Sequence, residues 1–212
     1  MRPALAAPVV LAAVLLLAGC GGDGGDGGSG SSVSGADLVG PFEAQAQQAY
    51  DDQGADRDDA VATEAGVAVA ECFAVDAAGA QSIGEATGQD GEWTTGTDGE
   101  LSGPPGEESL SCSLQRDGEP ADLDVDLSTT ALDRDGLVGI LTERGYVEVD
   151  ATGTDLDPDS VLVLNSEQGA GILAIWVDGG FRVSVAGTGL ERDQAGAVLQ
   201  AAVTAVSEHL EQ

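Results

Sequence analysis

Most of the residues whose types and spacing could do chemistry are acidic. Asp155, Asp157 and Asp159 have the first three spacings of an EF-hand loop, in which carboxylate oxygens coordinate calcium. Position six of such a loop needs glycine for a sharp turn and position twelve needs a bidentate glutamate, but Ser160 and Ser166 occupy these positions. The three aspartates are therefore candidates for a metal site with an incomplete motif, and a calcium-binding protein stays an alternative hypothesis.

A catalytic centre is not indicated by any motif in the sequence. The one histidine, His209, lies near the end of the last expected helix, where its charge would interact favourably with the helix dipole. Gly187-Thr188-Gly189 resembles the start of a dinucleotide loop, but Arg192 stands at the third glycine position, so a helix cap is the preferred interpretation. No Gly-x-Ser-x-Gly nucleophile elbow occurs. We expect no enzyme activity and no cofactor, and an envelope enzyme is a further, less favoured hypothesis.

Cys20 could accept a lipid. It ends the stretch Leu17-Ala18-Gly19-Cys20 after an apolar run that is shorter than the roughly 20 residues a spanning helix needs. Arg2 and the apolar residues 9–17 have the layout of a secretory signal. The stretch resembles the lipobox of bacterial lipoproteins, in which the cysteine is lipidated and the chain is cut before it. This resemblance implies a lipoprotein signal peptide over 1–19, acyl chains such as palmitate on Cys20, and a lipid anchor on the extracytoplasmic face of the cell membrane.

Two further cysteines follow. With Cys20 lipidated, Cys72 and Cys112 form an even pair in an oxidising compartment. A bridge between them would close a loop of about 40 residues and contribute about 3–4 kcal/mol in the chain-entropy model. Two separate buried thiols are the alternative that the residues alone leave open.

The charge balance excludes some partners. Without residues 1–19, six arginines face 38 acidic residues, for a net charge of −32, and the chain has no lysine. Such a surface repels phosphates and anionic headgroups, so we expect no nucleic-acid partner. Arginine without lysine, together with abundant Ala, Gly, Val and Asp, is typical of a GC-rich genome and favours an actinobacterial source over a haloarchaeal one.

Composition divides the mature chain into a tether and one domain. Residues 20–36 hold the lipidated cysteine and a linker rich in Gly, Ser and Asp, with too little apolar content to fold. A flexible coil of this length spans about 20–24 Å. Residues 37–212 are expected to form a single domain, in which 87–108, rich in Gly, Pro, Thr and acids, is a long loop.

Hydrophobic periodicity predicts an α+β fold for this domain. Helices are expected over 41–51 and over 56–72, although Val67 and Val69 also allow a strand in the second of these. A third helix is expected from an N-cap at Asp76 to about Gly84 or Gly88, and a fourth over 131–144, with Thr130 and Asp133 as a capping box. The last helix is expected to run from a cap at Thr188 and Glu191 to Leu210. Strands are expected over 110–115, 121–128, 146–149, 161–164, 172–177 and 181–185.

Two apolar patterns predict how these elements pack. In the strand expected over 121–128, Leu123, Val125 and Leu127 alternate with aspartates, which indicates a sheet with one buried and one solvent-exposed face (the dry and the wet face). The last helix has an apolar stripe that must be buried, formed by Ala195, Leu199, Val203, Val206 and Leu210. We expect an antiparallel sheet with helices packed on one face.

The domain resembles a known group. Cys72 precedes a short helix, Cys112 opens a hairpin strand, and later strands lead into a terminal helix, over roughly Ala70–Leu210. In these features the chain is similar to small actinobacterial surface lipoproteins with a two-cysteine domain of unknown function, which is distantly similar to the extracellular sensor domain of mycobacterial serine/threonine kinases. The resemblance implies a Cys72–Cys112 bridge and no catalytic residue. The tryptophan that often follows the second cysteine in that group is replaced here by Ser113 and Leu114.

A binding role follows from these inferences. We expect a lipid-anchored cell-envelope protein with a non-catalytic binding, accessory or sensor-like domain, whose partner is an unknown envelope protein or ligand. The wet sheet face or the 87–108 loop would carry the contact, and Trp93 is the candidate binding residue because it lies alone in a polar segment. The alternative is that Trp93 folds back onto the core.

Overall fold

The computed structural model describes residues 33–52, 67–69, 72–96, 99–104, 106–166, 171–188 and 190–212. The predicted signal peptide, Cys20 and the linker up to residue 32 lie outside the described residues. The same is true of most of the predicted 56–72 helix, of which only residues 67–69 and Cys72 are described; residues 67–69 form a strand, and Cys72 lies outside any helix.

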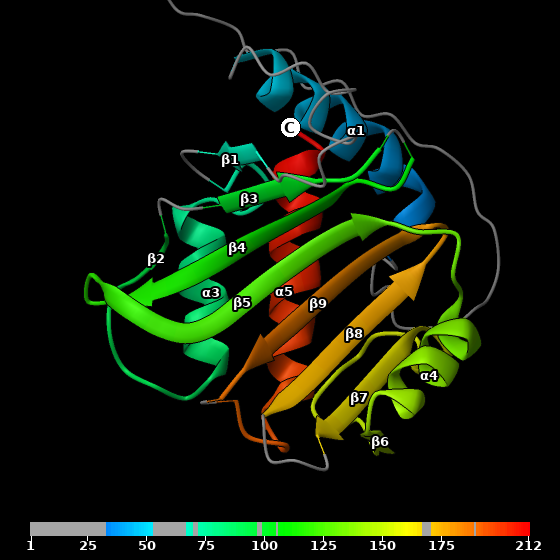
Figure 1. The fold of residues 1–212 in the computed structure, drawn as a ribbon. Coiled ribbons are helices and arrows are strands. Elements are labelled where there is room, and N and C mark those ends of the chain that lie inside the picture. The colour runs from blue at the N-terminus through cyan, green and yellow to red at the C-terminus, as the bar shows by residue number, and fades with distance from the viewer. Residues whose placement is uncertain are drawn as a thin grey trace, which may run out of the picture. The chain divides into compact units, whose positions relative to one another are not determined.

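Nine strands of the described residues form one antiparallel sheet (Figure 1). The strands are β1 (Val67–Val69), β2 (Trp93–Thr95), β3 (Gly99–Ser102), β4 (Ser109–Arg116), β5 (Glu119–Thr129), β6 (Tyr146–Val149), β7 (Val161–Ser166), β8 (Ile172–Asp178) and β9 (Phe181–Gly187). Their order across the sheet is β1-β3-β4-β5-β9-β8-β7-β6, and β2 also pairs with β4. The helices are α1 (Gly35–Asp52), α3 (Ala77–Ala86), α4 (Arg134–Glu143), α5 (Ala195–Leu210) and the 3-10 turn η1 (Pro158–Ser160). The predicted α+β class with an antiparallel sheet is confirmed.

The main core lies between one face of the sheet and the helices α1, α3 and α5, two of which, α3 and α5, are seen behind the sheet in Figure 1. Leu123, Val125 and Leu127 of β5 point into this core, as their alternation with aspartates predicts. The predicted stripe of α5 is buried along its whole length, at Ala195, Leu199, Val203, Val206 and Leu210. Burial of this stripe explains why a helix without a side-chain N-cap is stable.

A smaller core lies on the opposite face, under α4. Leu137 of α4 packs there against Leu162 and Leu164 of β7 and Ile175 and Val177 of β8. The expectation of helices on one face therefore holds for α1, α3 and α5, and α4 is an addition on the other face. The cause is local, because β7 and β8 are apolar at consecutive positions and so have two dry faces at this end of the sheet.

Three predicted helix starts differ from the structure. The first helix begins at Gly35 rather than at Pro41, because the N–H of Gly35 donates to Asp178 Oδ2 at 2.7 Å and the apolar stripe continues through the proline. The helix expected over 131–144 begins at Arg134, with Asp133 as N-cap instead of Thr130. The last helix begins at Ala195 rather than near Thr188.

Two strands interrupt the segment expected to be a long loop over 87–108. Thr94 and Thr95 of β2 lie opposite Gln115 and Leu114 of β4, and β3 pairs with the preceding part of β4. The glycine and proline content of this segment favours a loop, and the two strands, of three and four residues, are too short to give a clear periodicity in the sequence. The exposed edge that β4 would otherwise have is covered by both of them.

Candidate functional site at the α4–β6 end of the sheet

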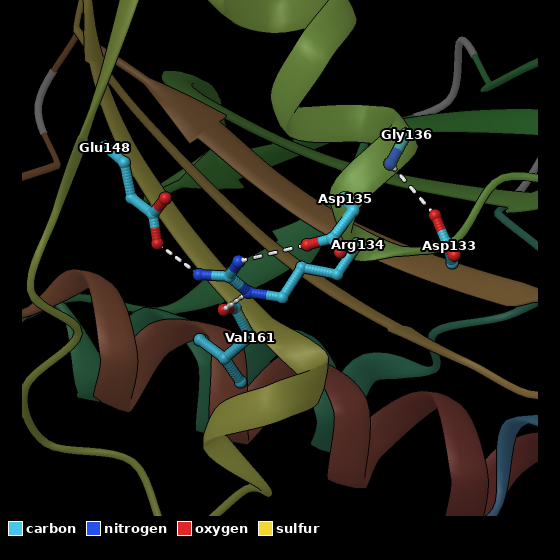
Figure 2. Close-up of polar contacts among 6 residues, drawn as sticks. All are labelled: Asp133, Arg134, Asp135, Gly136, Glu148 and Val161. Atoms are coloured by element: carbon cyan, nitrogen blue, oxygen red, sulfur yellow. Dashed lines mark hydrogen bonds and ion pairs between the residues drawn. The ribbon is translucent and has the colours of Figure 1, made fainter.

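Arg134 is the centre of a polar network where α4, β6 and β7 meet (Figure 2). Its Nε donates a hydrogen bond to the carbonyl oxygen of Val161 at 3.0 Å, and its guanidinium forms an ion pair with Glu148. A second guanidinium nitrogen lies 3.9 Å from Asp135 Oδ1. Because the Arg134 side chain is 28% exposed, the ion pair contributes more to position than to stability.

The local sequence explains why the Arg134 side chain extends from the start of α4 towards β6 and β7. Asp133 caps α4 by accepting a hydrogen bond from the N–H of Gly136 at 2.9 Å, which fixes Arg134 as the first helical residue. A cation is unfavourable at the positive end of a helix, and the contacts with Glu148 offset this. The carbonyl of Val161 is open to Arg134 because β6 ends at Val149.

Two pockets flank Arg134, and Arg134 and Pro158 line both. The larger, of about 790 Å³, lies between the β5–α4 segment, η1 and the β8–β9 turn. The smaller, of about 580 Å³, lies between β6, the 150–156 segment and β7.

Two of the four aspartates that line the larger pocket, Asp133 and Asp178, have structural roles. Asp133 caps α4 and Asp178 holds the start of α1, whereas Asp135 is almost fully exposed. Among the described residues that line the two pockets there is no histidine or cysteine, and their polar groups are carboxylates, hydroxyls and the Arg134 guanidinium.

The candidate calcium ligands lie close to this end but do not converge. Asp157 Oδ1 accepts from the N–H of Asp159 at 3.0 Å and so turns towards its own backbone at the start of η1. The N–H of Asp155 donates to Gln200 at 3.1 Å, and all three aspartates are exposed. Within the described part of the chain, no three His, Cys, Asp or Glu side chains are arranged to hold a metal ion.

The wet face of the sheet is less uniform than the sequence suggests. Asp124 accepts a hydrogen bond from the Ser113 hydroxyl at 2.7 Å. Burial is the main factor that raises the pKa of Asp126, with a smaller contribution from Asp124, while the Ser111 hydrogen bond and Arg182 oppose it. Burial likewise lowers the pKa of Arg182.

Trp93, the candidate binding residue, belongs to the core. It is 2% exposed, and its ring fills the space beside Gly84, where a β-carbon would come within 2.1 Å of it. Its indole N–H lies 3.4 Å from the carbonyl oxygen of Gln89, and the guanidinium of Arg116 lies 5.8 Å from the ring centre. The structure therefore agrees with the alternative, in which Trp93 folds back onto the core.

The cysteine pair is bridged. Cys72 and Cys112 form a disulfide with their Cα atoms 5.5 Å apart, which joins the segment before α3 to the middle of β4. The other chemistry-bearing residue, His209, is half-buried near the end of α5, and its Nδ1 has no hydrogen-bond partner among the described residues.

No family model and no curated protein matches the chain. None of the described helices is both long and apolar enough to cross a membrane.

The Arg134–Glu148 pair and the Asp178–Gly35 contact are not indicated by the sequence. Neither pair has a local signal, because the partners are 14 and 143 residues apart. In a chain with 38 acidic residues, a single Asp or Glu cannot be selected from the sequence as a partner.

Proposed function

We propose that the protein is a lipid-anchored component of the cell envelope, held by acyl chains on Cys20, with a non-catalytic domain that binds another envelope component. In this proposal residues 1–19 are removed as a lipoprotein signal peptide. The domain acts as a binding, accessory or sensor-like module on the extracytoplasmic face of the membrane.

The observation that carries the proposal is the pairing of the cysteines. Because Cys72 and Cys112 form a disulfide, two of the three cysteines of the sequence are accounted for, and Cys20 is the third. An exported protein with an odd cysteine needs a use for it, and the Leu17-Ala18-Gly19 context supports lipid attachment. The disulfide also favours an oxidising compartment.

Charge and tether length support the same arrangement. A mature chain with a net charge of −32 is repelled by anionic headgroups, so electrostatics alone would not hold it at a membrane. Acyl burial gives about 0.8 kcal/mol per methylene, and two chains make a stable anchor where one is marginal. The Gly-rich linker then separates the domain from the membrane surface.

A non-catalytic role is supported by what the polar side chains do. Asp133 and Asp178 hold helix starts, and Arg134 is engaged by Glu148 and Val161. These residues position α4, α1 and the sheet edge, so part of the polar lining of the pockets has a structural role.

The test is membrane fractionation of the full chain, expressed with its leader in a bacterium that lipidates exported proteins and fed an alkyne fatty acid. The wild type should sediment with membranes and carry the alkyne label. Cys20→Ser should be soluble and unlabelled, whereas Ser31→Ala, a control in the same linker, should behave as the wild type. Equal membrane recovery of Cys20→Ser, or a wild type without label, would contradict the lipid anchor.

A further inference from the structure

β6 is the last strand at its end of the sheet, and β7 is its single partner among the strands that the structure describes. It therefore has one hydrogen-bonded edge and one outer edge. Proteins protect such edges with a short strand, charged side chains, proline, a bulge or a covering element. β6 is short, with four residues, but the carboxylate of its one charged residue, Glu148, is bound by Arg134. β6, with the sequence Tyr-Val-Glu-Val, has no proline or lysine and pairs with β7 without a register shift.

Hydrogen bonding in β7 determines which of its residues face β6. Residues of an antiparallel strand alternate between bonding to one neighbour and to the other. The N–H of Ser166, at the end of β7, donates to the carbonyl of Gly171 just before β8. The even-numbered residues of β7 therefore bond towards β8, and the odd-numbered residues bond towards β6.

The register then identifies the free groups of β6. Val147 and Val149 lie opposite odd-numbered residues of β7, so their N–H and C=O groups belong to the β6–β7 ladder. Tyr146 and Glu148 therefore direct their N–H and C=O groups to the outer edge. Among the described residues, no turn, loop or cap hydrogen bond of the backbone reaches these outward groups, and no strand other than β7 pairs with β6.

The side chains at this edge leave room for another strand. Tyr146 packs towards α4 and Glu148 bonds to Arg134 of α4, so Val147 points to the other face. Val147 is 48% exposed and Ile140 of α4 is 40% exposed, and these are two of the three exposed large hydrophobic residues of the described chain. A strand added beside β6 would cover Val147.

The negative charge around β6 determines which kind of segment can bind at its outer edge. Residues 131–160, which include α4, β6 and η1, contain eight acidic residues and two arginines. A second copy of the chain would bring the same charge to the edge and be repelled, whereas a basic segment is attracted. We propose that the outer edge of β6 is a docking site for an extended, basic segment of another envelope protein, which adds to the sheet as a strand.

This inference rests on the proposed function for the location of the partner, but its test does not require the lipid. The probe is a seven-residue capped peptide in which lysine and valine alternate, titrated into the folded domain without the leader. A peptide of equal charge with proline in place of valine cannot pair along both edges and controls for charge alone. A peptide with glutamate in place of lysine controls for strand pairing alone.

Amide exchange reports the mode of binding. On addition of the Lys/Val peptide, the exchange of the Tyr146 and Glu148 amides should slow at least tenfold, while that of Val147 and Val149, already bonded to β7, should change little. Equal slowing along other strands, or none at Tyr146 and Glu148, would overturn the proposal. The proposal would also be overturned if exchange of these two amides slowed as the protein concentration was raised in the absence of peptide, because a second copy of the chain would then be the partner of β6.

A matched pair of variants separates the backbone from the side chain. Glu148→Pro removes the outward N–H, and Glu148→Ala removes the same carboxylate but keeps the N–H. If both melt like folded proteins, Glu148→Pro should bind the peptide about threefold to tenfold more weakly than Glu148→Ala, the loss expected for one hydrogen bond. Equal affinities of the two variants would exclude strand addition at this edge. Should Glu148→Pro not fold, the exchange experiment on the wild type decides alone.

Discussion

Truncation of Leu199 tests how the central helix is packed. Leu199 has no exposed surface and lies in the middle of the buried α5 stripe. Replacing a fully buried leucine with alanine removes its transfer free energy and leaves a cavity, which together cost about 3–5 kcal/mol. For a domain of this size, each kcal/mol lowers the melting temperature by about 2–4 °C, so Leu199→Ala should melt about 6–20 °C below the wild type.

The assay is thermal unfolding followed by circular dichroism, with Leu132→Ala as the matched control. Leu132 is 40% exposed, so the same truncation there should cost less than about 1 kcal/mol. Leu199→Asp or Val206→Asp would place an unpaired charge in the core and should abolish the cooperative transition. A normal melting curve for either aspartate variant, or equal shifts for the two alanine variants, would refute the packing of α5 against the sheet.

Further predictions concern the disulfide, the wet face and the tryptophans. A thiol assay on the folded, unreduced domain should find Cys72 and Cys112 unreactive, and two free thiols would show that the bridge is absent. Because burial raises the pKa of Asp126 in the folded state, its ionisation costs more there than in the unfolded chain, and the free energy of unfolding should fall as pH rises from its ordinary pKa of 3.8 through the raised value. Asp126→Asn should remove that part of the slope in urea titrations across this range, and an unchanged slope would contradict the assignment. Trp93, measured in a Trp176→Phe variant, should emit at short wavelength and resist acrylamide, since it is 2% exposed, whereas a red-shifted, quenchable emission would place it on the surface.

The sequence predicts most reliably where one periodicity runs through a whole element. The alternation at Leu123, Val125 and Leu127 and the stripe on α5 are both reproduced, because each involves many residues that must face the same core. The N-cap at Asp76, which accepts from the N–H of Gly79, is a local signal and is also confirmed. The Cys72–Cys112 bridge, implied by the resemblance to two-cysteine lipoproteins, is present in the structure.

Helix starts are less predictable when a strand continues into the expected cap. β5 pairs with β9 as far as Thr129, and the N–H of Thr130 still bonds to Gly180, so Thr130 cannot act as the cap of α4. β9 likewise extends to Gly187, and the chain needs the following residues to cross from the sheet to the helix layer. Long-range pairing, which the sequence does not reveal, decides both boundaries.

The α4–β6 site could not be predicted for a similar reason. Nothing local connects Arg134 to Glu148, and the outer edge of β6 becomes visible only when the order of the strands is known. Conversely, the aspartates at 155, 157 and 159 have a suggestive spacing, but Pro158 begins a 3-10 turn that directs Asp157 to its own backbone. Spacing predicts a ligand set only if the loop folds around an ion.

The most direct test of the central claim is the mass of the N-terminal peptide of the protein purified from membranes. We expect this peptide to begin at Cys20, to lack residues 1–19 and to carry the added mass of more than one acyl chain. A peptide that begins at Cys20 without added lipid, or one that retains residues 1–19, would contradict the lipid anchor.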